Sequence, residues 1–149
     1  MSDSLAVREL FVYGTLMSHF DNPMAFVLER NCQLVGKGFF PGKLFYINND
    51  YPGAIYEEEA VESPVYGQLF TIAPEAYQQV MRLLDQFQNF KENSPESSLF
   101  IRTILPIEAD GHKVPCWTYV YNQSTEDATN IPSGNYWQFL KDQNLHKKS

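Results

Sequence analysis

Short stretches in which apolar residues alternate with polar ones, or follow one another in a brief run, predict β-strands along much of the chain. These stretches are residues 9–13, 43–48, 65–72, 99–108 and 114–121. The last two are joined at Asp110-Gly111, a dipeptide that is typical of a tight β-hairpin. Glycines and prolines between residues 36 and 42 are expected to interrupt the chain before the second strand begins.

A different spacing, with apolar residues every three or four positions, predicts a helix that follows Pro74 and ends near Phe87. One face of this helix is an apolar stripe that should pack on a core. The stripe consists of Ala76, Val80, Leu83, Leu84 and Phe87. The next segment, residues 91–98, is polar and is expected to form a loop and the most mobile part of the protein.

Two further helices are predicted from their capping residues. Asn22 and Pro23 supply an N-cap and a proline at the first helical position of a helix over about residues 23–31. Ser133 is expected to cap a final helix over about residues 133–145.

The composition fits one strand-rich domain that spans residues 1–149, a length at which a single core can form. Aromatic residues make up 15% of the chain, with 11 Phe and 9 Tyr, which favours strands over a helical bundle. The net charge is −7, and basic residues cluster only at Lys147-Lys148. We therefore expect no nucleic-acid partner, because phosphate binding needs a concentrated basic face.

The sequence also argues against a membrane partner, a metal and a cofactor. The apolar stretches fall short of the roughly 20 residues that cross a membrane, and the Met1–Ser4 start resembles no signal region, so we expect a cytoplasmic protein without a membrane partner. Cys32 and Cys116 are the only cysteines and lack the spacing of a zinc site or a disulfide framework. We expect no metal and no cofactor.

A candidate binding site lies early in the chain, where the apolar run that begins at Phe11 breaks at Gly14-Thr15. This pattern predicts a strand that delivers a tight turn. Glycine permits positive φ and lets a ligand approach the backbone closely. Successive N–H groups in such a turn can form a concave nest for a carboxylate or phosphate oxygen.

Six short motifs occur in an order that resembles the γ-glutamylcyclotransferase-like family, also described as AIG2-like. They are Val12-Tyr13-Gly14-Thr15-Leu16, Tyr51-Pro52-Gly53, Val65 to Phe70, Leu84-Asp85, Phe100-Ile101-Arg102 and Trp117 to Tyr121. The resemblance runs from about residue 10 to 122. It implies an α+β fold, a mixed and mostly antiparallel β-barrel flanked by helices.

The resemblance also implies a reaction, in which a γ-glutamyl amide or peptide is cyclised to 5-oxoproline and an amine is released. In the family, the turn that matches Tyr13, Gly14, Thr15 and Leu16 holds the α-carboxylate through backbone N–H groups. Tyr119 is a further candidate for substrate binding, although most tyrosines on a strand face are packing residues. The ligand is expected to be a small γ-glutamyl compound.

The family's general acid and base is a Glu in the pattern Leu-Asp-x-x-Glu, and this chain has Gln88 at that position. A carboxamide can form hydrogen bonds but has no useful proton affinity. Loss of a positioned general base typically costs on the order of 10²- to 10⁴-fold in rate. We therefore expect a pocket for a carboxylate-bearing small molecule with weak or absent cyclotransferase activity.

Several alternatives stay open. Another acid could replace the missing Glu, and the candidates are Glu92, Glu96, Glu57, Glu58 and Glu59. Gln88 could be natural or an introduced change, and the barrel could instead serve only as a protein-interaction module. The sequence leaves the leaving amine and the oligomeric state undetermined.

Three residues near the expected site are interpreted without a catalytic role. Asp85 is expected to bond local backbone near the helix end. Arg102 is expected to be a solvated or paired surface group. Phe100 stands where the family tends to have Tyr, which makes the site less polar.

Overall fold

The computed structural model describes residues 7–148, with side chains through residue 143. The Met1–Ser4 start, which the signal-peptide argument used, lies outside the described residues, as do the Lys147-Lys148 side chains and the ends of the predicted 1–149 domain. Within the described part, no helix combines the length and the apolar character that a membrane crossing requires.

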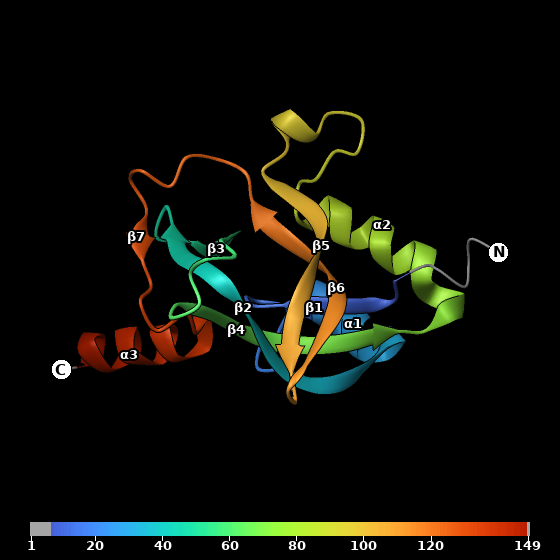
Figure 1. The fold of residues 1–149 in the computed structure, drawn as a ribbon, viewed down its shortest axis with the longest axis horizontal. Coiled ribbons are helices and arrows are strands. Elements are labelled where there is room, and N and C mark those ends of the chain that lie inside the picture. Colours follow the sequence, from blue (N-terminus) through green and yellow to red (C-terminus); the bar gives the residue numbers. More distant parts are fainter. Residues whose placement is uncertain (1–6, 149) are drawn as a thin grey trace.

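Among the described residues, seven strands form one twisted, mixed sheet, and five of them close into a barrel (Figure 1). They are β1 (Glu9–Val12), β2 (Cys32–Ile47), β3 (Tyr51–Tyr56), β4 (Pro64–Ile72), β5 (Phe100–Ala109), β6 (His112–Tyr121) and β7 (Thr129–Asn130). The order is β3-β2-β4-β1-β6-β5, and pairing of β2 with β5 closes the barrel. Only the β1–β6 pair is parallel within residues 7–148, so the predicted mixed, mostly antiparallel α+β barrel is confirmed.

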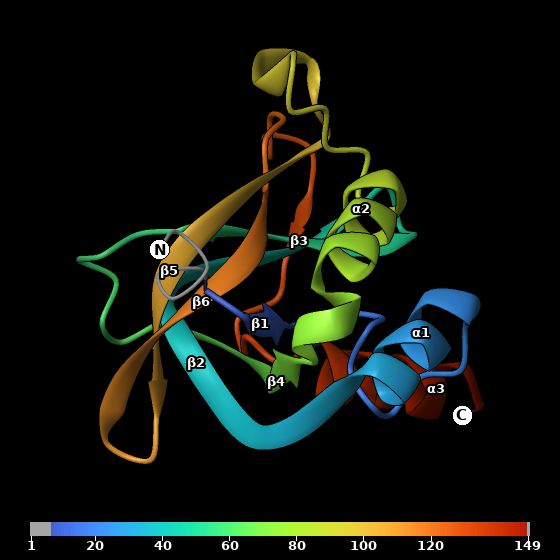
Figure 2. The same cartoon turned by 90° about the vertical axis from the view of Figure 1, so that its right-hand side faces the viewer.

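The prediction that glycines and prolines interrupt the chain between residues 36 and 42 is wrong. Strand β2 runs unbroken for 16 residues, pairing first with β4 and then with β3. Its register shifts between Leu34 and Gly36, and Figure 2 shows the strand bending strongly along its length. The glycines therefore allow the strand to curve, as expected at a barrel corner. The strand stays continuous because β4 and then β3 supply its hydrogen-bond partners.

Strands β3 and β7 were not predicted. Strand β3 contains Pro52 and Gly53, residues that argue against a strand interior. Both residues are tolerated because β3 lies at the end of the strand order, where β2 is its one pairing partner among the described strands. The hairpin at Asp110-Gly111 is confirmed, and both residues have positive φ, at 52° and 79°.

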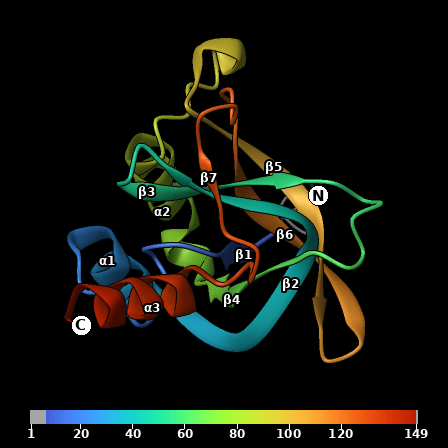
Figure 3. The ribbon, with the colours of Figure 1, turned by 90° about the vertical axis from the view of Figure 1, so that its left-hand side faces the viewer.

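The helical segments are α1 (Pro23–Asn31), α2 (Tyr77–Phe87) and α3 (Tyr136–Lys148), with single 3₁₀ turns at η2 (Pro74–Ala76) and η3 (Pro95–Ser97). Figures 2 and 3 show all three α-helices on one side of the barrel, opposite the β5–β6 hairpin. Val80 and Leu84 of the predicted stripe are buried, as is Met81, but Phe87 is 44% exposed, so the stripe packs inward over only part of its length. Pro74 opens the 3₁₀ turn that precedes α2.

The capping predictions differ in outcome. Asn22 is confirmed as the N-cap of α1, because its Oδ1 accepts a 2.8 Å hydrogen bond from Ala25 N–H. The prediction for Ser133 is wrong. Asn135 caps α3 instead, and its Oδ1 accepts a 3.0 Å hydrogen bond from Gln138 N–H. The cap moves because Gly134, with φ of 67°, still belongs to the preceding turn.

The polar segment between α2 and β5 is anchored to its surroundings. Ser98 is buried, and its Oγ accepts a 2.7 Å hydrogen bond from Lys91 N–H. Asn122 at the end of β6 donates from Nδ2 to the carbonyls of Pro95 and Ser98. The mobility expected for residues 91–98 stays a prediction.

Candidate functional site

A cavity of about 240 Å³ opens where the turn after β1, the start of β3, the end of α2 and the strands β5 and β6 meet. Its wall contains all six residues that the sequence predicted for the site: Tyr13, Gly14, Thr15, Leu16, Gln88 and Tyr119. The other lining residues are Phe11, Val12, Tyr51, Pro52, Phe87, Asn89, Leu99 and Phe100. The structure thus places the turn opposite the helix end, while the roles of these residues stay predictions.

Gly14 does not use the positive φ that glycine permits. Among the glycines of the described chain, positive φ occurs at Gly111 and Gly134. Gly14 is required for space instead, since a Cβ added there would lie 2.6 Å from Cγ of Pro52. A stiff proline ring cannot move aside easily, so the turn and β3 pack closely only with glycine at this position.

The carbonyl groups of the turn are used within the protein. Gly14 C=O accepts from Met17 N–H at 3.1 Å, and Thr15 C=O accepts from Nδ2 of Asn22 at 2.8 Å. The side chain of Asn22 therefore bonds the turn with its Nδ2 and the first turn of α1 with its Oδ1. This second role of Asn22 was missed, because nothing in the sequence pairs it with Thr15.

The amide groups of the same turn are free. Within residues 7–148, no hydrogen bond is made by the backbone N–H of Gly14, Thr15 or Leu16. Buried backbone donors are almost always paired with protein, water or ligand. Three consecutive unpaired donors beside a cavity can therefore hold an anionic oxygen.

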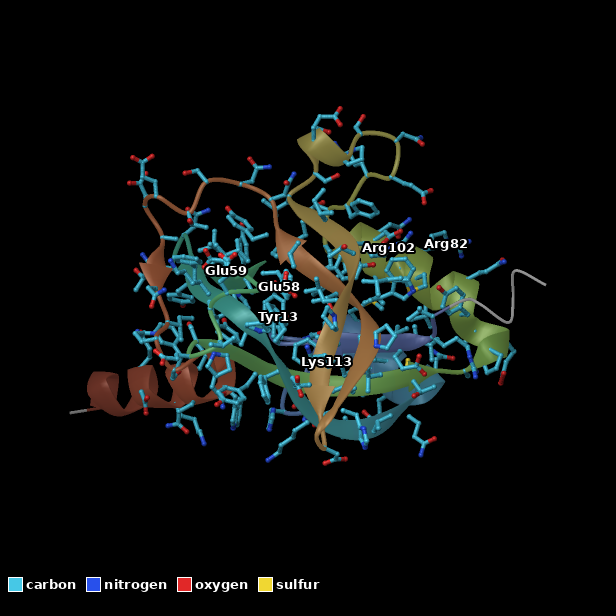
Figure 4. The ribbon with its side chains drawn as sticks, viewed as in Figure 1. Tyr13, Glu58, Glu59, Arg82, Arg102 and Lys113 are labelled. Carbon is cyan, nitrogen blue, oxygen red and sulfur yellow. The ribbon has the colours of Figure 1, made fainter. Side chains whose placement is uncertain are left out.

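Tyr13 shapes the site through its hydroxyl. That group donates a 2.7 Å hydrogen bond to the carbonyl of Tyr119 on β6 and accepts one of 3.1 Å from Ala54 N–H on β3. Burial raises the pKa of Tyr13 well above its usual range, so the phenol stays neutral. Tyr13, labelled near the middle of Figure 4, thus joins the end of β1 to β3 and β6.

Gln88 directly follows α2, and its N–H donates a 2.9 Å hydrogen bond to Leu84 C=O. Asn89 has φ of 53° and ends the helix in a left-handed conformation that asparagine tolerates. The half-buried Gln88 side chain forms no hydrogen bond within the described part of the protein. Its carboxamide is therefore available to the cavity that it lines.

Asp85 does not bond local backbone through its side chain, so that prediction is wrong. Its Oδ1 accepts a 2.5 Å hydrogen bond from the hydroxyl of Tyr119, and its Oδ2 lies 3.0 Å from NH1 of Arg102. Burial and the neighbouring carboxylate raise the pKa of Tyr119. The contact was missed because 34 residues separate its two partners.

Arg102 is paired with carboxylates, which was one of the two roles expected for it. Besides Asp85, its guanidinium approaches Glu92 at 3.5 Å and lies over the rings of Trp117 and Phe90, at 4.9 and 5.5 Å from their centroids. Figure 4 shows Arg102 beside α2. Its charge is thus used to hold α2 and the following loop on the barrel.

The five acids considered as substitutes for the missing Glu do not line the cavity. Glu92 is 80% exposed and faces Arg102. Glu57 pairs with Lys43 at 3.7 Å, and Glu58, Glu59 and Glu96 are exposed. No cluster of three or more potential metal-binding side chains occurs among residues with described side chains.

The aromatic wall was predicted only in part. Phe100, the residue that stands for the family's Tyr, is buried and packs its ring 6.2 Å from Tyr51 and 5.5 Å from Tyr121. Tyr51 and Pro52 also line the cavity. Their motif was visible in the sequence, but only strand pairing shows that it faces the turn.

Solved structures share this fold. YkqA from Bacillus subtilis is 23% identical with a TM-score of 0.67, over 97% of this chain and 44% of YkqA, so the chain spans less than half of that protein. An AIG2-like protein from Mus musculus is 22% identical with a TM-score of 0.61, over 80% of each chain. A structure described as gamma-glutamyl cyclotransferase is 10% identical with a TM-score of 0.52, over 82% and 68% of the two chains.

No curated protein sequence matches the chain. The family model described as Gamma-glutamyl cyclotransferase, AIG2-like, matches residues 10–139, which extends beyond the resemblance noted in the sequence and reaches into α3. By this match over most of its length, the chain belongs to the gamma-glutamyl cyclotransferase, AIG2-like family.

Proposed function

We propose that the cavity binds a small carboxylate of the γ-glutamyl type, with the carboxylate on the N–H groups of Gly14, Thr15 and Leu16. One observation supports this proposal: the cavity is lined by Gly14, Thr15, Leu16 and Gln88, whose backbone amides (residues 14–16) and side-chain carboxamide (Gln88) have no hydrogen-bond partner among the described residues. The cavity volume of about 240 Å³ suits a compact ligand, and its aromatic walls exclude water around the bound group.

We further propose that cyclisation is weak or absent. The reaction needs a group that removes a proton from the α-ammonium and returns one to the departing nitrogen. Gln88 can do neither. The carboxylates of Asp85 and Glu92 are both directed at Arg102, which argues against either as a replacement. The cytoplasmic location expected from the sequence stays part of this proposal.

The test measures 5-oxoproline release from a γ-glutamyl amine by the unaltered protein and by three variants. Gln88→Glu restores the family's acid and should raise the rate by on the order of 10²- to 10⁴-fold. Gln86→Glu is the matched control, because it adds the same charge at an exposed position outside the cavity wall. It should leave the rate unchanged.

The third variant, Glu92→Gln, tests the substituted-acid alternative. If the unaltered chain already turns over and Glu92→Gln abolishes this activity, Glu92 is the general base and the proposal of a weakened site fails. If Gln88→Glu folds but gains no activity, the assignment of Gln88 to the reacting end of the cavity fails.

A further inference from the structure

The cavity is electrically neutral. None of its lining residues within the described chain is Asp, Glu, Lys, Arg or His. The hydroxyls of Tyr13 and Tyr119 are already engaged, one with backbone groups and the other with Asp85. The remaining polar groups of the wall are therefore uncharged: backbone amides, the Tyr51 hydroxyl and the side chains of Thr15, Gln88 and Asn89.

Asp85, the carboxylate behind Tyr119, cannot act as a counter-ion for a ligand. It already accepts hydrogen bonds from Tyr119 at 2.5 Å and from Arg102 at 3.0 Å. Arg102 in turn also faces Glu92. The Asp85–Arg102 pair is neutral and lies outside the cavity wall, and Glu92 is 80% exposed to water, so these groups offer little to a positive charge within the cavity.

Two parts of a ligand would meet different surroundings. A carboxylate would be matched by three N–H donors, whose partial charges favour an anion. An α-ammonium would leave water for a wall without charged residues, and an unpaired buried charge carries a large desolvation cost. Gln88 offers it one carbonyl oxygen but no compensating negative charge.

A neutral amide or lactam fits the same place better. The Gln88 side chain has one acceptor oxygen and one NH₂ donor. A ligand amide carries the complementary pair, an N–H donor and a carbonyl acceptor. Both groups can therefore be satisfied without burying a net charge near Gln88.

We propose that this cavity selects small carboxylic acids whose nitrogen is uncharged, namely lactam acids and N-acylated amino acids, over free amino acids that carry an α-ammonium. The inference rests on the carboxylate site of the proposed function, and it favours the lactam or acylated form of the ligand over the free γ-glutamyl amine, whose α-ammonium is charged. On this basis Gln88 is a specificity-determining residue, and the cavity favours an acylated nitrogen over the amine that a cyclisation would start from.

The experiment compares three five-membered rings by calorimetry at neutral pH. 5-Oxoproline has a carboxylate and a neutral lactam nitrogen, proline has the same carboxylate and a charged nitrogen, and 2-pyrrolidinone has the lactam without the carboxylate. We expect 5-oxoproline to bind at least about tenfold more tightly than proline, and more tightly than 2-pyrrolidinone.

Variants locate the selectivity. Gln88→Glu should weaken 5-oxoproline and strengthen proline, which removes or reverses the preference, because a carboxylate now faces the ring nitrogen. Gln86→Glu changes the net charge equally outside the cavity wall and should keep the preference. Circular dichroism and a melting curve verify that both variants fold.

The outcomes separate the two proposals. Equal or tighter binding of proline by the unaltered chain, or a preference that survives Gln88→Glu, overturns the inference but leaves the carboxylate site standing. Equal binding of 5-oxoproline and 2-pyrrolidinone overturns the carboxylate site, and the inference with it. Absence of binding by every ring overturns both.

Discussion

The hydroxyl of Tyr119 on β6 donates a 2.5 Å hydrogen bond to the carboxylate of Asp85 on the last turn of α2. The bond crosses from the barrel to the helix, and Arg102 on β5 reinforces it at 3.0 Å. Gln88 follows Asp85 by three residues. The position of the carboxamide in the cavity therefore depends on a contact between a wall residue, Tyr119, and Asp85, which lies outside the wall.

Tyr119→Phe removes this bond and keeps the ring. We expect a loss of about 1.5 kcal/mol in the free energy of unfolding, the lower end for a bond to a charged group, since Asp85 retains Arg102. Urea denaturation measures it. Tyr66→Phe at an exposed position is the control and should change little. An unchanged stability of Tyr119→Phe would show that the bond does not hold α2 in solution.

Alkaline pH should destabilise the protein before most of its tyrosines ionise. Burial raises the pKa of Cys32 from 9.0 to about 11 and that of Cys116 to about 12, and it also raises the pKa of Tyr13 and Tyr119. A group whose folded pKa is raised contributes stability below its unfolded pKa, and this is lost as pH rises. Each such group lowers stability by about 1.4 kcal/mol per pH unit.

The decline should therefore begin near pH 9 with the thiols and steepen above about 10 with the tyrosines. Urea denaturation between pH 8 and 11, in the presence of a reducing agent, measures it. Tyr13→Phe should reduce the slope above about pH 10, whereas Tyr66→Phe should not. A stability that stays constant from pH 8 to 11 would contradict the burial of these groups.

Two glycines isolate the cost of backbone conformation, because neither position is crowded. A Cβ added to Gly111 or to Gly36 would meet nothing within 4 Å, but only Gly111 has a positive φ, 79°. We expect Gly111→Ala to lose about 1–2 kcal/mol. Gly36→Ala should be neutral or gain up to about 1 kcal/mol by restricting the unfolded chain. Equal effects in chemical denaturation would contradict the left-handed hairpin.

Features set by local chemistry could be predicted from the sequence. The Asp110-Gly111 turn and the Asn22 cap depend on residues close in the chain. The site motifs could be read only through the family resemblance. The continuity of β2 and the Asp85–Tyr119 bond depend on partners far along the chain, which leave no periodic signal. Their prediction needs the strand order, which one sequence does not contain.

Gly14 and Pro52 provide the sharpest test of how the turn is held. Gly14→Ala places a Cβ 2.6 Å from Cγ of Pro52, and this overpacking should cost about 1–3 kcal/mol. Pro52→Ala removes the ring atoms that clash. The double variant should therefore be more stable than the sum of the single losses predicts, by about 0.5–3 kcal/mol.

Urea denaturation of the four proteins measures this coupling, and calorimetry with 5-oxoproline follows the site. If the crowding displaces the turn, Gly14→Ala should weaken binding and Pro52→Ala should restore part of it in the double variant. Additive stabilities would mean that Gly14 and Pro52 do not touch in solution. A different outcome is that the stability losses are non-additive but the affinity for 5-oxoproline is unchanged. The turn would then have moved without affecting the ligand, and the amides of residues 14–16 would not be the carboxylate site.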